Sequence, residues 1–260
     1  FTGSCAVGNQ LYQKVAARKI RIQMEMGGKN PTIVLKDADL DYAADILVNG
    51  AFFSTGQKCT ACSRAIIEKA IYEPLVEKLL EKTRKLKVGN GLESGVQMGP
   101  AVDASQLETD LKYIEIAKKE GAKLLCGGKR LTDGVYEHGY FVEPTIFDEV
   151  TPQMRIAQEE VFGPVLALMR AENFDEAMKL ANGIPFGLSA SIVSRDLTRV
   201  HQFVQGIEAG LITVNLPTAG VEYQLPFGGT KESSFGMREQ GPLALDFYTE
   251  TRTVYLKYTQ

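Results

Sequence analysis

One thiol and one carboxylate form a pair that could carry out covalent chemistry on a carbonyl group. Cys59 follows a Gly-Gln turn, and Glu25 lies just before a Gly-Gly pair at positions 27 and 28. A cysteine can attack a carbonyl carbon to form a covalent intermediate, and a carboxylate can take a proton from the water that attacks this intermediate. Positions 25 and 59 are 34 residues apart, which is too far for one local turn, so only a fold can bring them together.

Both residues also have ordinary structural explanations. Most cysteines are small buried residues without reactivity, and most glutamates at strand ends are simply solvated. Cys59 also forms a C-x-x-C pattern with Cys62, as a redox dithiol or half of a zinc site would. A zinc site needs two further ligands, but His138 and His201, the only histidines, are far apart in the sequence. We therefore expect no metal site, and the Gly-Gln approach to Cys59 together with its offset from Glu25 favours the catalytic interpretation.

Two further segments contain groups suited to a phosphate or a sugar. Gly3 and Ser4 precede a predicted helix, and backbone N–H groups at a helix N-terminus attract anions; Ser4 as a plain helix cap is the structural alternative. Glu160 could accept hydrogen bonds from two ribose hydroxyls, and Phe162 could pack on a flat ring, although both would also suit an ordinary loop. The many glycines and prolines of residues 215–238 predict an ordered, functional loop.

Composition limits the partners of this chain. Its 260 residues are enough for one large domain or two ordinary ones. The 29 basic and 32 acidic residues give a formal net charge of −3, which provides no reason to expect a nucleic acid or an anionic membrane as partner. No apolar run approaches the ~18–20 residues needed to cross a bilayer, and four cysteines do not make a disulfide framework. We expect free thiols and a reducing, cytoplasmic location.

Alternating strand and helix patterns predict the elements that would position these side chains. We expect strands at residues 23–26, 32–35, 64–68, 123–126, 165–169, 190–193 and 211–214. We expect helices at residues 9–19, 39–53, 71–86, 106–120, 174–181 and 197–205. This alternation predicts an α/β fold with a largely parallel sheet and helices on both faces. A final run at residues 249–258 also favours a strand, which must pair with another strand or remain an exposed edge.

Taken in order, the motifs resemble those of the NAD(P)-dependent aldehyde dehydrogenases over the whole chain. They are Phe1-Thr2-Gly3-Ser4, Glu25-x-Gly27-Gly28-Lys29-Asn30-Pro31, Gly56-Gln57-x-Cys59-Thr60, Glu160-x-Phe162-Gly163-Pro164 and Pro226-Phe227-Gly228-Gly229-x-Lys231-x-Ser233. The resemblance implies an α/β catalytic domain with a mostly parallel sheet flanked by helices. It divides the chain into a remnant of a Rossmann-like cofactor domain (1–25), the catalytic domain (26–236), and a return segment with an oligomerisation strand (237–260).

The resemblance also implies roles for individual residues. Cys59 would attack the aldehyde, the resulting thiohemiacetal would give hydride to NAD+ or NADP+, and Glu25 would activate the water that hydrolyses the thioester. Glu239 matches a buried glutamate proposed to relay protons toward this base. The residues implied to contact the cofactor, with Glu160 on the nicotinamide ribose and Ser4 facing the phosphates, are Gly3, Ser4, Met26, Gly27, Glu160 and Phe162.

The chain lacks part of what the family pattern contains, which leaves further possibilities open. It has no start methionine and reads as the middle of a longer protein; the family's N-terminal half would supply most of the nucleotide-binding sheet and one oxyanion-hole side chain. We therefore expect the parent protein to be the dehydrogenase and this chain alone to be inactive as one. The alternatives are a non-oxidising assembly module with at most weak esterase activity, and a thioesterase or thiol hydrolase. Residues 251–258 match an arm that extends the sheet of a neighbouring subunit, which implies a homodimer or homotetramer.

The identity of the aldehyde is suggested by a narrower resemblance. Residues 215–220 and 224–226 are similar to bacterial enzymes that oxidise 2-oxoglutarate semialdehyde (2,5-dioxopentanoate). A substrate with a remote carboxylate needs a nearby cation, and Lys58 and Arg64 are the candidates closest to Cys59 in the sequence. Arg64 is better explained as a structural core residue. Residues 234–237 differ from the glycines and small residues that many family members have there, which leaves the shape of the substrate tunnel open.

Overall fold

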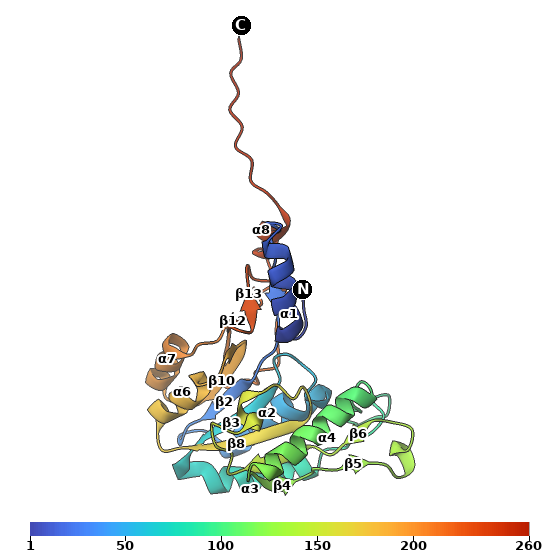
Figure 1. Ribbon diagram of the computed structural model, residues 1–260. Coiled ribbons are helices and arrows are strands. Elements are labelled where there is room, and N and C mark those ends of the chain that lie inside the picture. Colours follow the sequence, from blue (N-terminus) through green and yellow to red (C-terminus); the bar gives the residue numbers. More distant parts are fainter. Residues whose placement is uncertain (260) are drawn as a thin grey trace.

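A seven-stranded sheet forms the centre of the molecule (Figure 1). The computed structural model describes residues 1–259, and the strands follow the order β11-β10-β2-β3-β8-β7-β4. All neighbouring pairs are parallel except β4 and β7, which run antiparallel. The strands are β2 (Asn30–Val34), β3 (Cys62–Glu68), β4 (Lys123–Cys126), β7 (Thr145–Asp148), β8 (Val165–Ala171), β10 (Ser189–Val193) and β11 (Leu211–Val214). The predicted α/β fold with a mainly parallel sheet is confirmed.

Helices cover both faces of this sheet. One face packs against α2 (Leu40–Phe52) and α3 (Tyr72–Arg84). The other packs against α4 (Ala104–Lys119), α5 (Arg155–Gln158), α6 (Phe174–Asn182) and α7 (Leu197–Gly206). Several helices begin at a side-chain cap that satisfies a free backbone N–H group. The capping residues are Asp39 for α2, Asp103 for α4, Asn173 for α6 and Asp196 for α7.

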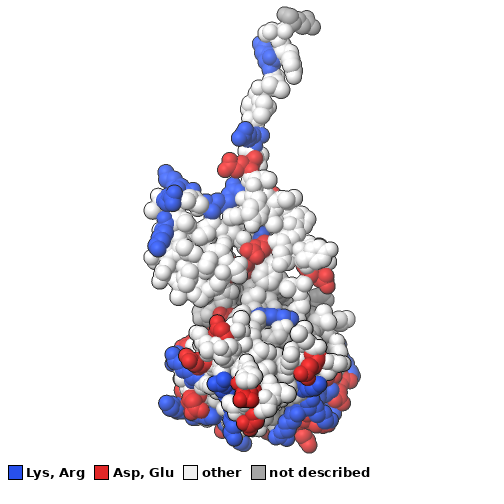
Figure 2. All heavy atoms as spheres, turned by 90° about the vertical axis from the view of Figure 1, so that its right-hand side faces the viewer, with Lys and Arg blue, Asp and Glu red and all other residues white. Residues whose placement is uncertain are grey.

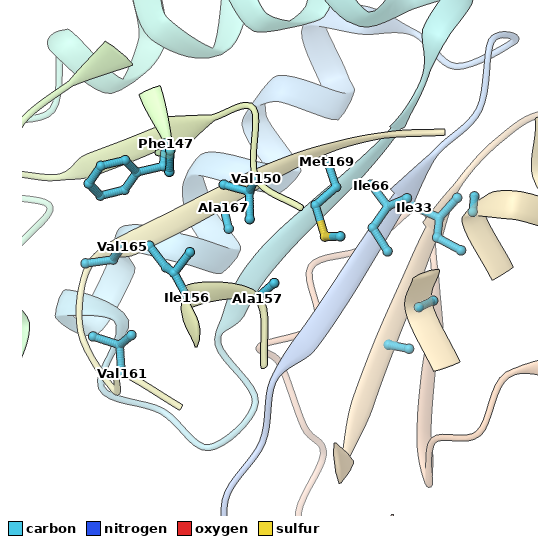
Figure 3. Packing of buried hydrophobic residues seen from close by; sticks show 14 of the residues in the cluster. Ile33, Ile66, Phe147, Val150, Ile156, Ala157, Val161, Val165, Ala167 and Met169 are labelled. Atoms are coloured by element: carbon cyan, nitrogen blue, oxygen red, sulfur yellow. The ribbon is translucent and has the colours of Figure 1, made fainter. Parts of the chain in front are cut away.

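Successive residues of the central strands contribute to two different hydrophobic clusters. Ile66 in β3 belongs to the cluster on the α4–α7 face, whereas Ala65 and Ile67 belong to the cluster on the α2–α3 face. Figure 3 shows the first of these clusters, in which Ile66 lies beside Ile33 and Met169. A sheet that is covered on both faces needs apolar residues at consecutive positions, and this is why the strands read as unbroken apolar runs.

A smaller group of elements stands at one end of the sheet (Figure 1). It contains α1 (Cys5–Ala16), α8 (Ala244–Tyr248) and the antiparallel pair of β1 (Met24–Glu25) and β13 (Ser234–Phe235). Other short elements are β5 (Arg130–Leu131), β6 (Phe141–Val142), β9 (Phe186–Gly187), β12 (Thr230–Lys231) and the 3₁₀ turns Phe53–Gly56, Lys69–Ile71 and Gly134–Tyr136. The β1–β13 pair places Glu25 directly opposite Ser234, although the two are far apart in the sequence.

The predicted elements agree with the structure best where periodicity is strong. The strands predicted at residues 123–126 and 211–214 have the observed bounds. The helix predicted at residues 9–19 is wrong at both ends, since α1 begins at Cys5 because Ser4 caps it, and ends at Ala16. The strand predicted at residues 23–26 contains β1. Strand β7 and the other two-residue strands were not predicted, because elements this short show little or no alternation to detect.

The segment after α8 differs from its prediction. Residues 251–259 are extended and pair with no strand among residues 1–259, so the strand predicted at 249–258 does not form within the single chain. Figure 1 shows this segment leading away from the other elements. Figure 2 shows charged side chains of both signs over the sheet-bearing part of one face. Within the same described residues, no helix is both long and apolar enough to span a bilayer.

Arg64, one of the two cations considered for substrate binding, is a structural residue of β3. It is 1% exposed, and its guanidinium donates to the carbonyl oxygens of Lys29 at 3.0 Å and of Leu180 and Ala181 at 2.9 Å. The last two belong to the final turn of α6, where carbonyl groups have no partner within the helix. Arg64 therefore caps α6 and joins it to the segment before β2, and it is not available to a substrate.

Replacing Arg64 with methionine should lower the free energy of unfolding by about 3 kcal/mol, because three buried carbonyl oxygens lose their donors. Arg195→Met removes an arginine whose side chain is 69% exposed and pairs with Asp39, so it should change stability by less than about 1 kcal/mol. Urea denaturation measures both values. Equally small effects of the two substitutions would contradict the capping role of Arg64.

Candidate active site

Three loops meet where three adjacent parallel strands begin. Residues 26–29 precede β2, residues 57–61 precede β3, and residues 159–164 precede β8. Because β2, β3 and β8 are neighbours that run in the same direction, their amino ends lie at one edge of the sheet. This edge brings together Gly28, Cys59 and Glu160, which line one small pocket.

Two glycines allow the first loop to contact both of the others. The N–H of Gly28 donates a hydrogen bond to Glu160 Oε1 at 2.8 Å. A Cβ atom on Gly27 would lie 2.7 Å from Glu160 Oε2, and one on Gly28 would lie 2.6 Å from the carbonyl oxygen of Cys59. Any side chain at these positions would push the carboxylate or the cysteine loop away, so the Gly-Gly pair is required for close approach.

The side chain of Asn30 holds the cysteine loop in place. Its Nδ2 donates to the carbonyl oxygens of Cys59 and Ala61, both at 2.8 Å, and its Oδ1 accepts from the N–H of Ser189 at 3.0 Å. Asn30 is buried, so these hydrogen bonds are formed away from solvent. The first residue of β2 thereby connects the loop before β3 to the start of β10.

The cysteine loop follows a strained turn at the end of α2. Ser54 and Thr55 have φ values of 56° and 59°, a left-handed conformation that non-glycine residues rarely adopt. Gly56 follows with a φ of 65°, and a Cβ atom there would lie only 2.3 Å from the carbonyl oxygen of Gly163. The backbone of the turn therefore packs directly on the loop that carries Glu160.

The surroundings of Cys59 favour its neutral thiol. Burial raises the pKa of Cys59, and the charges of Glu160 and, to a smaller extent, Glu25 raise it further, while backbone N–H groups lower it. The thiol is thus within electrostatic reach of both carboxylates. A nucleophilic role for Cys59 would therefore require another group to handle the thiol proton.

Glu25 is suited to exchange a proton near neutral pH. Its side chain is buried, and this burial raises the pKa of Glu25 to about 7. The hydroxyl of Ser234 donates to Glu25 Oε2 at 2.7 Å and lowers the pKa, as does the charge of Arg238, whereas the charge of Glu239 raises it. A carboxylate with a pKa close to the ambient pH can act as a general base.

Glu160 and Lys29 carry opposite charges in the same buried region. Burial raises the pKa of Glu160, and the N–H of Gly28 and the charge of Lys29 lower it. Burial, followed by the charge of Arg64, lowers the pKa of Lys29 to about 7. Within residues 1–259, Lys29 Nζ has no hydrogen-bond partner. Lys29 therefore acts on Glu160 through its charge and favours the ionised carboxylate.

The predicted cofactor-contacting residues of the N-terminal segment lie beside Glu25. The N–H of Gly3 donates to the carbonyl oxygen of Glu25 at 3.0 Å. Ser4 caps α1 by accepting from the N–H of Val7 at 3.4 Å, which is the structural alternative considered for this serine. Met26 is buried directly after Glu25.

Two other predicted residues lie at the border of the site. Glu239 is half-buried, not buried as expected, and its backbone pairs with Phe227 through hydrogen bonds of 2.7 and 2.8 Å. Its charge raises the pKa of Glu25, so the two carboxylates lie within electrostatic reach. Phe162 has a φ of 61° and is 38% exposed, which places its ring near the surface two residues after Glu160.

Cys62 of the C-x-x-C pattern belongs to the core. It is buried in β3, and its Sγ lies 3.2 Å from the Oγ1 of Thr32. All four cysteines are free thiols. In the part of the chain that the structure describes, no group of three or more His, Cys, Asp or Glu side chains could hold a metal ion.

Two residues of the site were not singled out from the sequence. Asn30 appeared only as one position of a motif, although a polar residue opening an apolar, buried strand signals a demand for hydrogen bonds. Ser234 had no local signal, because its partner Glu25 is 209 residues away. Their contacts with the loops define the site as much as the predicted residues do.

The fold and this cluster of side chains define an α/β protein with a cysteine and a half-buried carboxylate, Glu160, at the amino ends of its parallel strands, and with the buried Glu25 within electrostatic reach of that cysteine. The sequence model described as "Aldehyde dehydrogenase family" matches residues 1–254, and the chain belongs to this family. It is 51% identical over 257 residues to the alpha-ketoglutaric semialdehyde dehydrogenase of Bacillus subtilis, covering 99% of this chain and 53% of that protein. It is 48% identical over 258 residues to the 2,5-dioxopentanoate dehydrogenase of Saccharolobus solfataricus, with 98% and 53% covered.

Solved structures agree with this assignment. The NAD-dependent aldehyde dehydrogenase from Sinorhizobium meliloti superimposes with a TM-score of 0.92 at 39% identity, covering 96% of this chain and 49% of that chain. The betaine aldehyde dehydrogenase from Staphylococcus aureus in complex with NAD+ gives a TM-score of 0.93 at 35% identity, with 95% and 49% covered. The chain spans about half the length of the curated relatives it matches.

The electrostatic arrangement predicts the reactivity of Cys59. Glu160→Gln should speed alkylation of Cys59 by iodoacetamide about threefold to tenfold at a fixed neutral pH, because removing the carboxylate charge lowers the pKa of the thiol. Glu25→Gln should have a smaller effect in the same direction. The control Glu159→Gln changes a carboxylate that contacts Arg155 and Tyr113, and it should leave the rate unchanged. Mass spectrometry of the peptide containing Cys59 gives the rates, and slower alkylation in Glu160→Gln would contradict the arrangement.

Proposed function

We propose that this chain supplies the catalytic portion of an enzyme that oxidises an aldehyde to a carboxylic acid with NAD+ or NADP+. The observation that carries the proposal is the arrangement around the Gly-Gly pair: the Cys59 thiol lies within electrostatic reach of Glu25, a buried base with a pKa of about 7. Membership of the aldehyde dehydrogenase family supports the same reaction.

In this proposal Cys59 and Glu25 act in sequence. The sulfur of Cys59 bonds to the aldehyde carbon, and the thiol proton passes to the carbonyl oxygen, which the backbone N–H of Cys59 would help to stabilise. A bound nicotinamide would supply the hydride acceptor for this carbon, and the hydroxyl proton would be released. Glu25 then takes a proton from the water that attacks the thioester. The carbon–sulfur bond breaks, the sulfur of Cys59 regains a proton, and the carboxylic acid departs.

The residues present suit one part of a dinucleotide. Glu160 uses Oε1 for the N–H of Gly28, which leaves Oε2 to accept hydrogen bonds from ribose hydroxyls. The missing Cβ of Gly27 keeps space open beside this oxygen. Gly3 and Ser4 lie at the N-terminus of α1, where backbone N–H groups favour phosphate. Phe162 would lie beside the nicotinamide ribose.

We further propose 2-oxoglutarate semialdehyde as the substrate. Relatives that match nearly the whole chain at 48–51% identity carry the names of dehydrogenases for this aldehyde. The remote carboxylate of this substrate would bind Lys58, which is exposed next to Cys59 and forms no ion pair within residues 1–259. Arg64 has no such role because its guanidinium is used by backbone carbonyls.

The division of the chain and its assembly are part of the same proposal. Residues 1–25 would belong to the cofactor domain, residues 26–236 to the catalytic domain, and residues 237–260 to the return segment with its strand. Val254, Tyr255 and Leu256 are 70–92% exposed in the extended segment. Adding such a strand to the sheet of a second subunit would cover these side chains, and supports a homodimer or homotetramer. The proposed location is the cytoplasm.

The decisive experiment mixes the full-length enzyme that contains this chain with 2,5-dioxopentanoate and either NAD+ or NADP+, and follows reduced nicotinamide by absorbance. Cys59→Ala should abolish the reaction, since it removes the proposed nucleophile. Cys126→Ala, which removes a free thiol at the sheet edge in β4, should retain it. Undiminished reduction of NAD(P)+ by Cys59→Ala would reject the mechanism.

This chain covers only about half the length of its relatives. This coverage favours one alternative, a non-oxidising assembly module with at most weak esterase activity. An activated ester such as p-nitrophenyl acetate distinguishes it from the dehydrogenase. Cys59-dependent ester hydrolysis without any reduction of NAD(P)+ would support the alternative. A thiol hydrolase would also hydrolyse the ester without NAD(P)+, but faster than the weak esterase activity expected of the assembly module.

The proposed role of Lys58 predicts a change in specificity. Lys58→Met should raise the KM for 2,5-dioxopentanoate about two- to fivefold, as expected for the loss of an exposed ion pair, and leave the KM for pentanal unchanged. Lys58→Arg should behave like the original protein because it keeps the charge. Steady-state kinetics with both aldehydes measures this, and equal changes for the two would speak against carboxylate binding by Lys58.

A further inference from the structure

Ser234 connects the buried base to a neighbouring backbone loop. In the β1–β13 pair it lies directly opposite Glu25. Its Oγ lies 2.7 Å from Glu25 Oε2 and also accepts a hydrogen bond from the N–H of Gly229 at 2.6 Å. The hydroxyl thus bridges a backbone donor and a carboxylate.

The two contacts together determine the direction of the hydrogen bond. A backbone N–H can only donate, so Gly229 occupies a lone pair of the Ser234 oxygen. The single hydroxyl proton then points to the other partner, the carboxylate of Glu25. A hydrogen bond donated to a carboxylate is stronger when that group is ionised, so this contact favours the deprotonated form of Glu25.

The other groups around Glu25 affect its protonation in both directions. Glu239 repels a second negative charge, and burial also disfavours the ionised form. Arg238 acts in the opposite direction, but its guanidinium donates to the carbonyl oxygen of Gly229. Gln23 Nε2 contacts Glu25 Oε1 at 3.4 Å, a longer hydrogen bond. Ser234 is therefore the closest donor that opposes burial.

We propose that Ser234 is the positioning residue for the base: it orients the Glu25 carboxylate and keeps a large part of it deprotonated at neutral pH. The role of Glu25 as a base rests on the function proposed above, whereas the effect of Ser234 on the proton affinity of Glu25 does not. Ser234 acts only through Glu25 and need not touch the aldehyde.

The test measures the titration of Glu25 directly. In protein labelled with ¹³C at the glutamate carboxyl carbons, Glu25→Gln identifies the resonance of Glu25. Ser234→Ala should raise the midpoint of this resonance from about 7 by about one pH unit. Ser234→Thr, which keeps the hydroxyl, should restore it. Should the alanine variant fail to fold, Ser234→Cys keeps the volume with a weaker donor and should move the midpoint in the same direction.

A matched control removes a hydroxyl elsewhere. Ser191 Oγ donates to the carbonyl oxygen of Leu216 at 2.7 Å, and Ser191→Ala should leave the Glu25 midpoint unmoved. A midpoint that is unchanged in Ser234→Ala, or that Ser234→Thr does not restore, would overturn the positioning role.

The pH profile of aldehyde oxidation separates this inference from the proposed function. With the base at pH 7 falling from about half to about one-tenth deprotonated, Ser234→Ala should lose about fivefold in kcat and recover at higher pH. A shifted Glu25 titration in a protein that forms no reduced nicotinamide would reject the proposed function and retain the inference. If Ser234→Ala oxidises the aldehyde with an unchanged pH profile and the Glu25 titration does not move, the inference about Ser234 is rejected and the proposed function is retained.

Discussion

The side-chain amide of Asn30 is the interaction on which the arrangement of the site depends. It holds the carbonyl oxygens of Cys59 and Ala61 and accepts from the N–H of Ser189. Since Asn30 is also the first residue of β2, the strand that follows the Gly-Gly pair carries both the cysteine loop and the start of β10. One buried amide thus joins the segment that follows Glu25 to the loop that carries Cys59. Because Asn30 is buried, losing one of these hydrogen bonds would leave a buried polar group without a partner and would lower the free energy of unfolding.

The charges in the site are unusual in being buried and close to a thiol. Glu160 and Glu25 both oppose ionisation of Cys59, and burial acts in the same direction. A neutral thiol is less easily oxidised than a thiolate, so the two carboxylates make the sulfur less easily oxidised. Burial of Glu25 likewise raises its pKa to about 7. Near neutral pH, individual hydrogen bonds and charges therefore affect how much of Glu25 is protonated. The charge of Lys29 acts in the opposite direction on Glu160 and lowers the pKa of that carboxyl group.

The sequence allowed prediction of those features that leave a local or motif signature. The alternation of apolar runs and helical patterns indicated the parallel sheet, and strands such as β4 and β11 had the predicted bounds. The family motifs predicted that Glu25, Cys59 and Glu160 belong to one site, and the structure brings Cys59 within electrostatic reach of both carboxylates. Strand β1 was predicted, but β13 and the pairing of the two strands were not, since the two segments stabilise each other across most of the chain. The contact between Ser234 and Glu25 was missed for the same reason, and the terminal strand predicted at 249–258 finds no partner strand among residues 1–259.

The close backbone contact between Gly56 and Gly163 has a mechanical consequence. Both loops are also attached to the beginning of α4: Gln57 Oε1 accepts from the N–H of Val102, and Gln106 Nε2 donates to the carbonyl oxygen of Val161. A Cβ atom on Gly163 would lie 2.0 Å from Asp110 of the same helix. The helix and the two loops are therefore held together by direct contacts, and a displacement of α4 would change the positions of the loops that carry Cys59 and Glu160. Reactivity at the pocket is in this way coupled to a helix whose outer surface faces solvent.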